Sequence, residues 1–207
     1  MNEWYLRLPL TEKPNPSILN EEIRKRSCIG KKHWCASLDR IPDRLPYKKT
    51  IKRYIRRLHL YERCGYGLIL YGELGNGKTS LASIILRNAL AREGRVLSIR
   101  ATKLMDALLS KYPPRLPSGV TVCEAAERVN FLLIDDMAHD DADWRGRVLE
   151  DIVRSRYDEK LPTLITVNDK NVVYELKWLK SLAFEAFEGI GVDGVNWRRK
   201  PPPDDRT

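Results

Sequence analysis

Eight residues, Gly72-Glu-Leu-Gly-Asn-Gly-Lys-Thr79, constrain the fold of this 207-residue chain more than any other feature. They match the pattern G-x-x-x-x-G-K-[ST], in which glycines let backbone N–H groups converge on phosphate oxygens. The apolar run 67–71 before them reads as a buried strand, and the helical pattern over 80–92 follows. This strand–loop–helix context argues against a chance match and predicts a phosphate-binding P-loop.

The loop predicts ATP and Mg²⁺ as ligands. Lys78 is expected to reach the β- and γ-phosphates and to act in catalysis, and the Thr79 hydroxyl is expected to bind Mg²⁺. The dipole of the following helix adds to phosphate binding. The residues expected to bind the nucleotide are Gly72, Glu73, Leu74, Gly75, Asn76, Gly77, Lys78, Thr79 and Ser80.

Two acids follow a second apolar run, Phe131-Leu-Leu-Ile134. At the end of a buried strand, Asp135 is placed to hold Mg²⁺, as the Walker B aspartate of P-loop proteins does. The adjacent Asp136 is placed to orient and polarise an attacking water. For both residues a helix N-cap is the structural alternative, since Asp is favoured there.

A polar residue, Asn168, ends the next apolar run, Pro162–Val167. At the end of a strand beside the Asp135 strand, it is placed between the water and the γ-phosphate and is expected to sense that phosphate. An ordinary turn residue is the alternative.

Strand and helix patterns alternate along the chain. Further strands are expected at 95–100, 131–134 and 161–167, and helices at 46–64, 103–111, 122–128 and 145–159. Several of these strands are apolar throughout, which indicates a parallel sheet covered by helices on both faces.

Composition limits the other classes of function. No apolar run approaches the roughly 18 residues that cross a bilayer, and the N-terminus lacks a signal-peptide core, so a cytoplasmic protein is expected. The spacing of the four cysteines matches no zinc pattern, although Cys28, His33 and Cys35 leave a weak metal site open. We expect a polar arm over 1–34, one domain over 35–199 and a disordered tail over 200–207.

The positive charge is concentrated in one segment. The chain has a net charge of +9, and residues 21–63 hold fourteen Lys or Arg against five Asp or Glu, a balance of 14 − 5 = +9. This segment is expected to contact DNA, with a solvated basic face as the alternative. Trp34, Tyr47 and Tyr54 would stack on bases if exposed, although Tyr54 lies on the apolar stripe of its helix and is expected in the core.

These motifs resemble the AAA+ ATPases of the DnaC/DnaI helicase-loader and IstB transposition-helper family. The pieces that carry the resemblance are GYGLILYGELGNGKTSLA, FLLIDDM and RYDEKLPTLITVN, and it covers about residues 35–199. It implies an α/β P-loop fold of the AAA+ (ASCE) type, with a five-stranded sheet in the order 5-1-4-3-2. It also implies Walker A, Walker B and sensor 1 roles for Lys78/Thr79, Asp135/Asp136 and Asn168. The segment Gly194–Arg198 resembles the short G-x-x-R ending of these proteins.

The chain departs from the family in two respects. Only about 35 residues precede the matching region, where family members carry a domain that grips the helicase. The segment 177–188 has no arginine, where the family has a finger that acts on a neighbour's ATP. Lys180 cannot form the planar fork of a guanidinium. Arg154 and Arg156 remain as finger candidates, and a structural role for Arg156 is equally open.

Three functions are compatible with these residues. The first is an ATP-dependent assembly factor that acts on DNA as an ATP-dependent homo-oligomer, with a helicase or a transposase as partner and weak or partner-dependent hydrolysis. The second is an adaptor that binds ATP with little hydrolysis. The third is a P-loop small-molecule kinase, although paired acids followed by a sensor asparagine are not the pattern of such kinases.

Overall fold

The computed structural model describes residues 27–92, 94–138, 144–175, 177–194 and 196–197. Its centre is a five-stranded sheet in the order β2-β3-β4-β1-β5, and each neighbouring pair is parallel. The strands are β1 (Gly67–Tyr71), β2 (Val96–Arg100), β3 (Phe131–Met137), β4 (Thr163–Val167) and β5 (Phe187–Gly191). The predicted order 5-1-4-3-2 is therefore confirmed.

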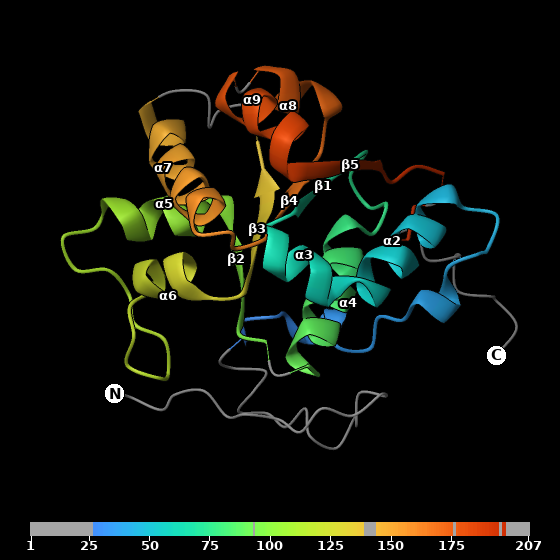
Figure 1. Ribbon diagram of the computed structural model, residues 1–207, viewed down its shortest axis with the longest axis horizontal. Coiled ribbons are helices and arrows are strands. Elements are labelled where there is room, and N and C mark those ends of the chain that lie inside the picture. The colour runs from blue at the N-terminus through green and yellow to red at the C-terminus, as the bar shows by residue number, and fades with distance from the viewer. Residues whose placement is uncertain (1–26, 93, 139–143, 176, 195, 198–207) are drawn as a thin grey trace, which may run out of the picture.

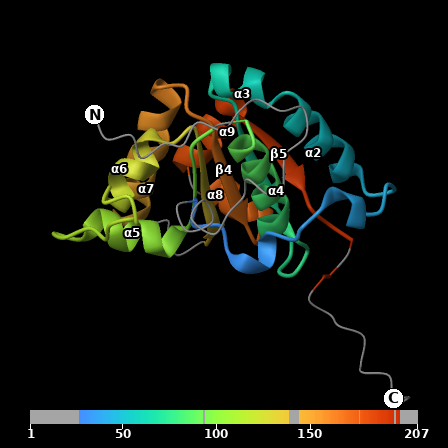
Figure 2. The ribbon, with the colours of Figure 1, turned by 90° about the horizontal axis from the view of Figure 1, so that it is seen from below.

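Helices cover both faces of the sheet (Figures 1 and 2). One face carries the 3₁₀ turns η1 (Lys31–His33) and η2 (Leu38–Arg40) and the helices α2 (Pro46–Arg56), α3 (Leu58–Cys64) and α4 (Lys78–Leu90). The other carries α5 (Ala101–Leu109), α6 (Val122–Arg128), α7 (Trp144–Asp158), α8 (Lys170–Glu175) and α9 (Lys177–Ala186). The result is the three-layer arrangement expected of a parallel sheet.

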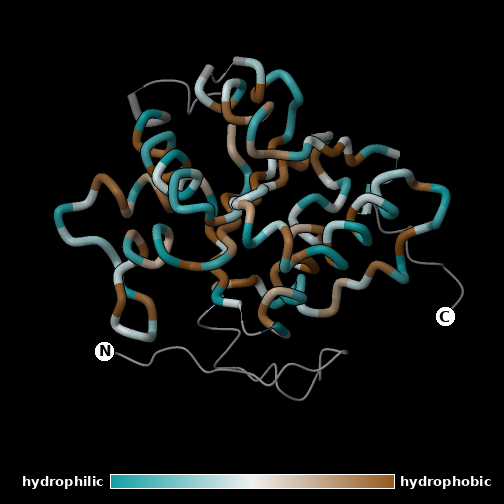
Figure 3. The backbone as a smooth tube through the Cα atoms, viewed as in Figure 1, coloured by the Kyte–Doolittle hydropathy of each residue, from teal (hydrophilic) through white to brown (hydrophobic). Residues whose placement is uncertain are grey.

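Side chains of the central strands alternate between two hydrophobic cores. In β1, Leu68 and Leu70 pack with the α2–α4 layer, whereas Ile69 packs with the opposite layer. In β3, Leu133 and Ile134 divide in the same way. Figure 3 shows the hydrophobic residues along the strands and on the inward faces of the helices. The continuously apolar strands therefore fill both cores at once.

Two elements differ from the expected ones. The helix expected over 46–64 is interrupted at Arg57, whose φ of −106° and ψ of 17° are not helical, so α2 and α3 are separate. The strand β5 has no continuous apolar run, because its sequence is FEGIG. It pairs with β1 from Gly67 opposite Phe187, and a Cβ at Gly67 would lie 2.6 Å from the Phe187 ring. A glycine at position 67 therefore permits this close pairing.

The segment 27–34, which we expected in the polar arm, packs on the domain. Ile29 and Trp34 are buried in the core that includes α4. Arg87 of α4 donates hydrogen bonds to the backbone oxygens of Trp34 and Ala36 at 2.5 and 2.8 Å. We call residues 27–36 the strap. Residues 1–26 of the arm, and the tail 200–207, lie outside the described residues.

Candidate nucleotide-binding site

The glycine-rich loop joins β1 to α4 at the carboxyl edge of the sheet. Gly77 precedes α4 with a φ of 90°, and Gly75 has a φ of 91°, a conformation that other residues rarely adopt. A Cβ at Gly75 would lie 2.5 Å from Asn196 Oδ1. The side chain of Asn76 turns inward, and its Nδ2 donates to the backbone oxygen of Val192 at 2.9 Å. Asn76 thus anchors the loop, and its own backbone N–H donates to the Glu73 oxygen at 3.4 Å.

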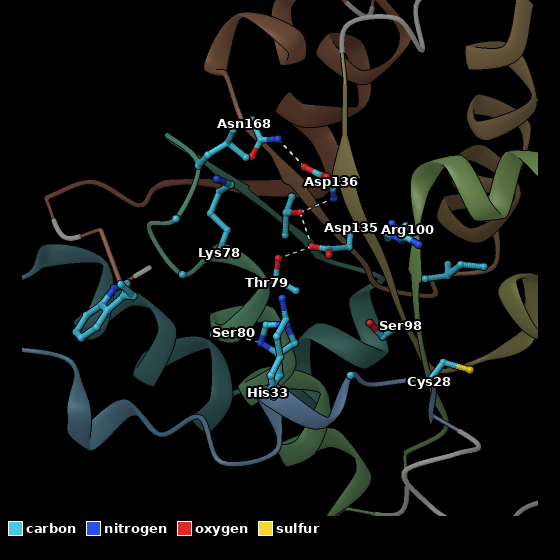
Figure 4. A pocket seen from close by; sticks show the side chains of 18 of the residues that line it. Cys28, His33, Lys78, Thr79, Ser80, Ser98, Arg100, Asp135, Asp136 and Asn168 are labelled. Carbon is cyan, nitrogen blue, oxygen red and sulfur yellow. Dashed lines mark hydrogen bonds between the residues drawn. The ribbon is translucent and has the colours of Figure 1, made fainter. Parts of the chain in front are cut away.

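Lys78 and Thr79 start α4 and face the cavity (Figure 4). The Lys78 ammonium donates to the backbone oxygens of Gly72 and Glu73 at 2.6 and 2.8 Å, which holds the cation above the loop. The Thr79 hydroxyl donates to Asp135 Oδ1 at 2.8 Å. The structure therefore brings together three residues that are up to 57 positions apart in the sequence, since 135 − 78 = 57.

Asp135 and Asp136 both line this cavity, although neighbouring strand residues normally point to opposite faces. The φ of Asp136 is 61°, and the pairing of β3 with β4 is irregular between Ile134 and Met137. This irregularity breaks the alternation and turns the second acid toward the first. Asp is one of the few residue types that tolerate such a φ.

Asn168 follows β4 and lies beside the second acid. Its Nδ2 donates to Asp136 Oδ1 (Figure 4). Because β4 lies between β1 and β3, Asn168 emerges between the glycine-rich loop and Asp136. The contact joins the two residues expected to orient water and to sense phosphate.

Thr166 is a site residue that the sequence analysis missed. Its hydroxyl donates to Asp135 Oδ1 and accepts a hydrogen bond from the backbone N–H of Asp136. A threonine within an apolar strand carries no motif. Only the register of β4 against β3 places it next to the acids.

The donor set fits a magnesium ion. Mg²⁺ prefers hard oxygen ligands in octahedral geometry at about 2.0–2.1 Å, so adjacent ligands lie about 3 Å apart. The oxygens of Thr79 and Asp135 are 2.8 Å apart and border the cavity. Thr79 and Asp135 are therefore the residues that would hold the ion.

The cavity extends beyond the glycine-rich loop to the strap. Its volume is about 720 Å³, and the strap forms one wall through Cys28, Gly30, Lys32 and His33. His33 Nδ1 lies 3.0 Å from the Ser80 hydroxyl. Burial lowers the pKa of His33, Lys32 lowers it further, and Asp135 opposes both. The neutral imidazole is therefore favoured beside the first turn of α4.

The remaining expected nucleotide ligands divide into two groups. Leu74, Gly75, Gly77 and Ser80 line the cavity, whereas Gly72, Glu73 and Asn76 do not, and Gly72 and Glu73 contribute backbone oxygens to Lys78. The backbone N–H of Trp197 donates to the Gly75 oxygen at 2.9 Å, and its side chain lines the cavity. Arg198, the arginine of the G-x-x-R ending, lies outside the described residues.

Arg156 does not lie at the cavity. It is fully buried, and its guanidinium donates to the backbone oxygens of Ala126, Val129 and Pro162 at 2.8, 2.9 and 2.9 Å and to Thr163 Oγ1 at 3.0 Å. Burial lowers its pKa to about 9, so it stays charged at neutral pH. A guanidinium enclosed in this way cannot reach a neighbour's ATP. This corrects the finger interpretation of Arg156 in favour of the structural alternative.

The three aromatics considered for base stacking are all buried: Trp34, Tyr47 and Tyr54. The condition for stacking is thus not met, and Tyr54 lies in the core as predicted. Three cations of α2 also form ion pairs within the protein: Lys48 and Lys52 lie 2.8 and 4.0 Å from Asp43, and Arg53 pairs with Glu188. The exposed cations of this helix and its end include Lys49, Lys52, Arg56 and Arg57.

Within the described ranges the cysteines form no metal site. No group of three or more His, Cys, Asp and Glu side chains gathers there to hold a metal, and Cys28 and Cys35 are exposed and not in a disulfide. Among the same residues, no helix combines the length and hydrophobicity needed to span a membrane.

The sheet order and the glycine-rich loop define an α/β P-loop fold of the AAA+ type. Solved structures with this fold include DnaI, with 22% identity and a TM-score of 0.65 over 84% of this chain and 100% of that chain. The DnaC helicase loader matches with 19% identity and a TM-score of 0.64 over 79% and 100% of the two chains. AMPPCP-bound DnaA from Aquifex aeolicus matches with 18% identity and a TM-score of 0.59, over 80% of this chain and 51% of its own.

The chain therefore has a DnaC/DnaI-like AAA+ fold, as the motif resemblance predicted. No protein-family model and no curated protein sequence matches it.

Proposed function

We propose that this protein binds ATP with Mg²⁺ and acts on DNA as an AAA+ ATPase, in the manner of helicase loaders or transposition helpers. The observation that carries the proposal is the set of hydrogen bonds among Thr79, Asp135, Thr166, Asp136 and Asn168 at the mouth of the glycine-rich loop. These bonds connect Thr79 and Asp135, the residues expected to hold Mg²⁺, with Asp136, which is expected to orient the water. Asn168, the expected phosphate sensor, is bonded to Asp136. A glycine-rich loop alone would carry no such assembly.

Each residue has a distinct part in the proposed reaction. The loop N–H groups and Lys78 bind the phosphates, and Thr79 and Asp135 hold Mg²⁺, which neutralises phosphate charge when bound. Asp136 orients the attacking water and accepts its proton in hydrolysis. Asn168 donates to Asp136, so it links the position of that acid to the γ-phosphate.

Hydrolysis is proposed to be weak or dependent on a partner. Arg156 is enclosed in the core, and Arg154 lies on the exposed face of α7 in an ion pair with Glu150 at 2.6 Å. An arginine acting on the γ-phosphate is worth about 10³–10⁵ in turnover in related chemistry, so a free subunit in which neither Arg154 nor Arg156 makes this contact would hydrolyse ATP slowly unless another arginine supplies it. The same observation favours the second candidate, an ATP-binding adaptor with little hydrolysis.

DNA is proposed to bind through phosphate contacts, because the α2 cations are exposed while the neighbouring aromatics are buried. Such binding is independent of sequence and weakens as salt rises. Residues 21–26 of the basic segment lie outside the described residues. ATP-dependent assembly of several subunits, with a helicase or a transposase as partner, is part of the same proposal.

The test measures nucleotide binding, DNA binding and turnover together. Wild-type protein should bind ATP only weakly without Mg²⁺, should bind DNA more tightly with ATP and Mg²⁺, and should release phosphate faster when DNA is present. The Lys78→Ala variant should lose these gains, whereas Lys111→Ala, an exposed lysine outside the cavity, should keep them. DNA binding that ignores both ATP and salt would contradict the proposal. ATP binding without DNA-stimulated phosphate release would favour the adaptor.

A further inference from the structure

The proposed hydrolysis calls for a positive charge near the γ-phosphate in addition to Lys78. Neither arginine considered for this role lines the cavity, because Arg156 is enclosed and Arg154 lies on α7. Among the described residues that line the cavity there is one arginine, Arg100. It ends β2, at the same edge of the sheet as Asp135.

The register of the sheet places Arg100 beside the expected magnesium ligand. Arg100 pairs with Asp135 across β2 and β3, and neighbouring strands lie about 4.8 Å apart. Paired residues of parallel strands point to the same face, so both side chains lie on the α4 side, where Thr79 is found. Figure 4 shows the Arg100 guanidinium next to Asp135, on the side away from Lys78.

The Arg100 guanidinium is available for a ligand. The residue is exposed at the cavity, and none of the described residues forms a hydrogen bond or ion pair with its side chain. Lys103, the next cation on the same wall, lies 3.6 Å from Asp106 on α5. A planar guanidinium also matches two phosphate oxygens at once, which an ammonium cannot do.

The geometry points to Arg100 as the arginine that contacts the γ-phosphate of ATP within the same subunit. As water bonds to phosphorus and the bond to ADP breaks, negative charge spreads over the γ-phosphate oxygens, and Arg100 stabilises it together with Lys78. The inference rests on the proposed ATP site. It goes further by assigning the role of the finger to a residue of the chain itself.

The experiment compares nucleotides with and without the γ-phosphate. The dissociation constants of a non-hydrolysable ATP analogue and of ADP are measured by calorimetry with Mg²⁺ for wild type, Arg100→Ala, Arg100→Lys and Arg128→Ala. Arg128 is an exposed arginine of α6 outside the cavity and serves as the control. Melting curves verify folding, and Arg100→Gln replaces the alanine variant if that variant does not fold.

We expect Arg100→Ala to raise the dissociation constant of the ATP analogue about tenfold, which is the scale of one charge-assisted hydrogen bond. The dissociation constant of ADP should not change. Arg100→Lys should restore part of the loss, and Arg128→Ala should change neither constant. Equal losses for both nucleotides, or no loss, would overturn the inference while wild-type ATP binding still supported the proposed function. A wild type that binds neither nucleotide would overturn both.

Discussion

The Thr166 hydroxyl lies 2.7 Å from Asp135 Oδ1 and donates a hydrogen bond to it. It also accepts from the backbone N–H of Asp136 at 2.8 Å. One small side chain therefore orients the first acid and holds the backbone of the second in its unusual conformation. This contact joins β4 to β3 at the point where their pairing becomes irregular.

Replacing Thr166 tests whether this contact matters for the proposed magnesium site. Thr166→Val keeps the shape but removes the hydroxyl, so Asp135 loses a donor and the Asp136 N–H loses its acceptor. A buried hydrogen bond of this kind is worth about 1–3 kcal/mol when one partner is removed. We expect about a tenfold higher Mg²⁺ concentration for half-maximal ATP binding. Thr166→Ser, which keeps the hydroxyl, should behave like wild type, and equal behaviour of the two variants would refute the assignment.

Removing the buried guanidinium of Arg156 should unfold the protein more readily. Arg156→Met removes the guanidinium that donates to the carbonyls of Ala126 and Val129, whereas the Pro162 oxygen keeps the Leu132 N–H at 3.3 Å. Each unsatisfied buried group costs about 1–3 kcal/mol, so the free energy of unfolding should fall by at least about 2 kcal/mol.

The control for Arg156 lies on the same helix. Arg154→Met removes an exposed ion pair and should change the free energy of unfolding by less than about 1 kcal/mol. Urea unfolding measures both variants. If Arg156→Met kept wild-type stability but lost turnover that depends on a second subunit, the finger interpretation would return.

Acidification should weaken the docking of the strap through His33. Its pKa in the folded protein is lowered by burial and by Lys32 and is partly restored by Asp135. The unfolded chain, with a His pKa of about 6.5, then binds a proton that the folded protein does not. The contribution of neutral His33 to the free energy of unfolding is therefore fully present above a pH of about 6.5, and it is lost as the pH falls below that value.

The His33→Gln variant tests this pH dependence. Gln does not titrate, so the loss of stability between pH 7.5 and 5.5, measured by urea unfolding, should be smaller than in wild type. An identical loss in both proteins would show that His33 is not responsible.

Charge reversal on α2 should weaken DNA binding without affecting the nucleotide. Lys52 and Arg56 are exposed, so Lys52→Glu with Arg56→Glu should lower DNA affinity for all sequences alike. The slope of log affinity against log salt should become shallower by about 2, since each phosphate contact contributes about 0.9.

Two exposed cations on the opposite layer control for net charge. Lys111→Glu with Arg128→Glu makes the same change in charge and should leave the salt slope unchanged. A similar loss in both double variants would mean that net charge, and not the α2 surface, attracts DNA.

Most of the fold could be predicted because its signals are local. The helix 122–128 was predicted with its observed bounds, and its start carries a capping box in which Thr121 and Glu124 bond reciprocally. The signals for the glycine-rich loop, Asp135 and Asn168 are equally local, since each follows an apolar run that predicts a strand. The strand β5 could not be predicted from an apolar run, because its sequence, FEGIG, contains two glycines and a glutamate. Only the family resemblance implied it.

The glycine-rich loop, the acids and the strands that carry them could be identified in the sequence alone, because each depends on neighbours along the chain. Which side chains meet across elements depends on the tertiary structure. It enclosed Arg156, buried Trp34 and Tyr47, docked the strap on α4 and placed Thr166 and Arg100 beside Asp135. These outcomes depend on strand register and on which helix covers which face. Those relationships arise between segments that are far apart in sequence, so no local pattern records them.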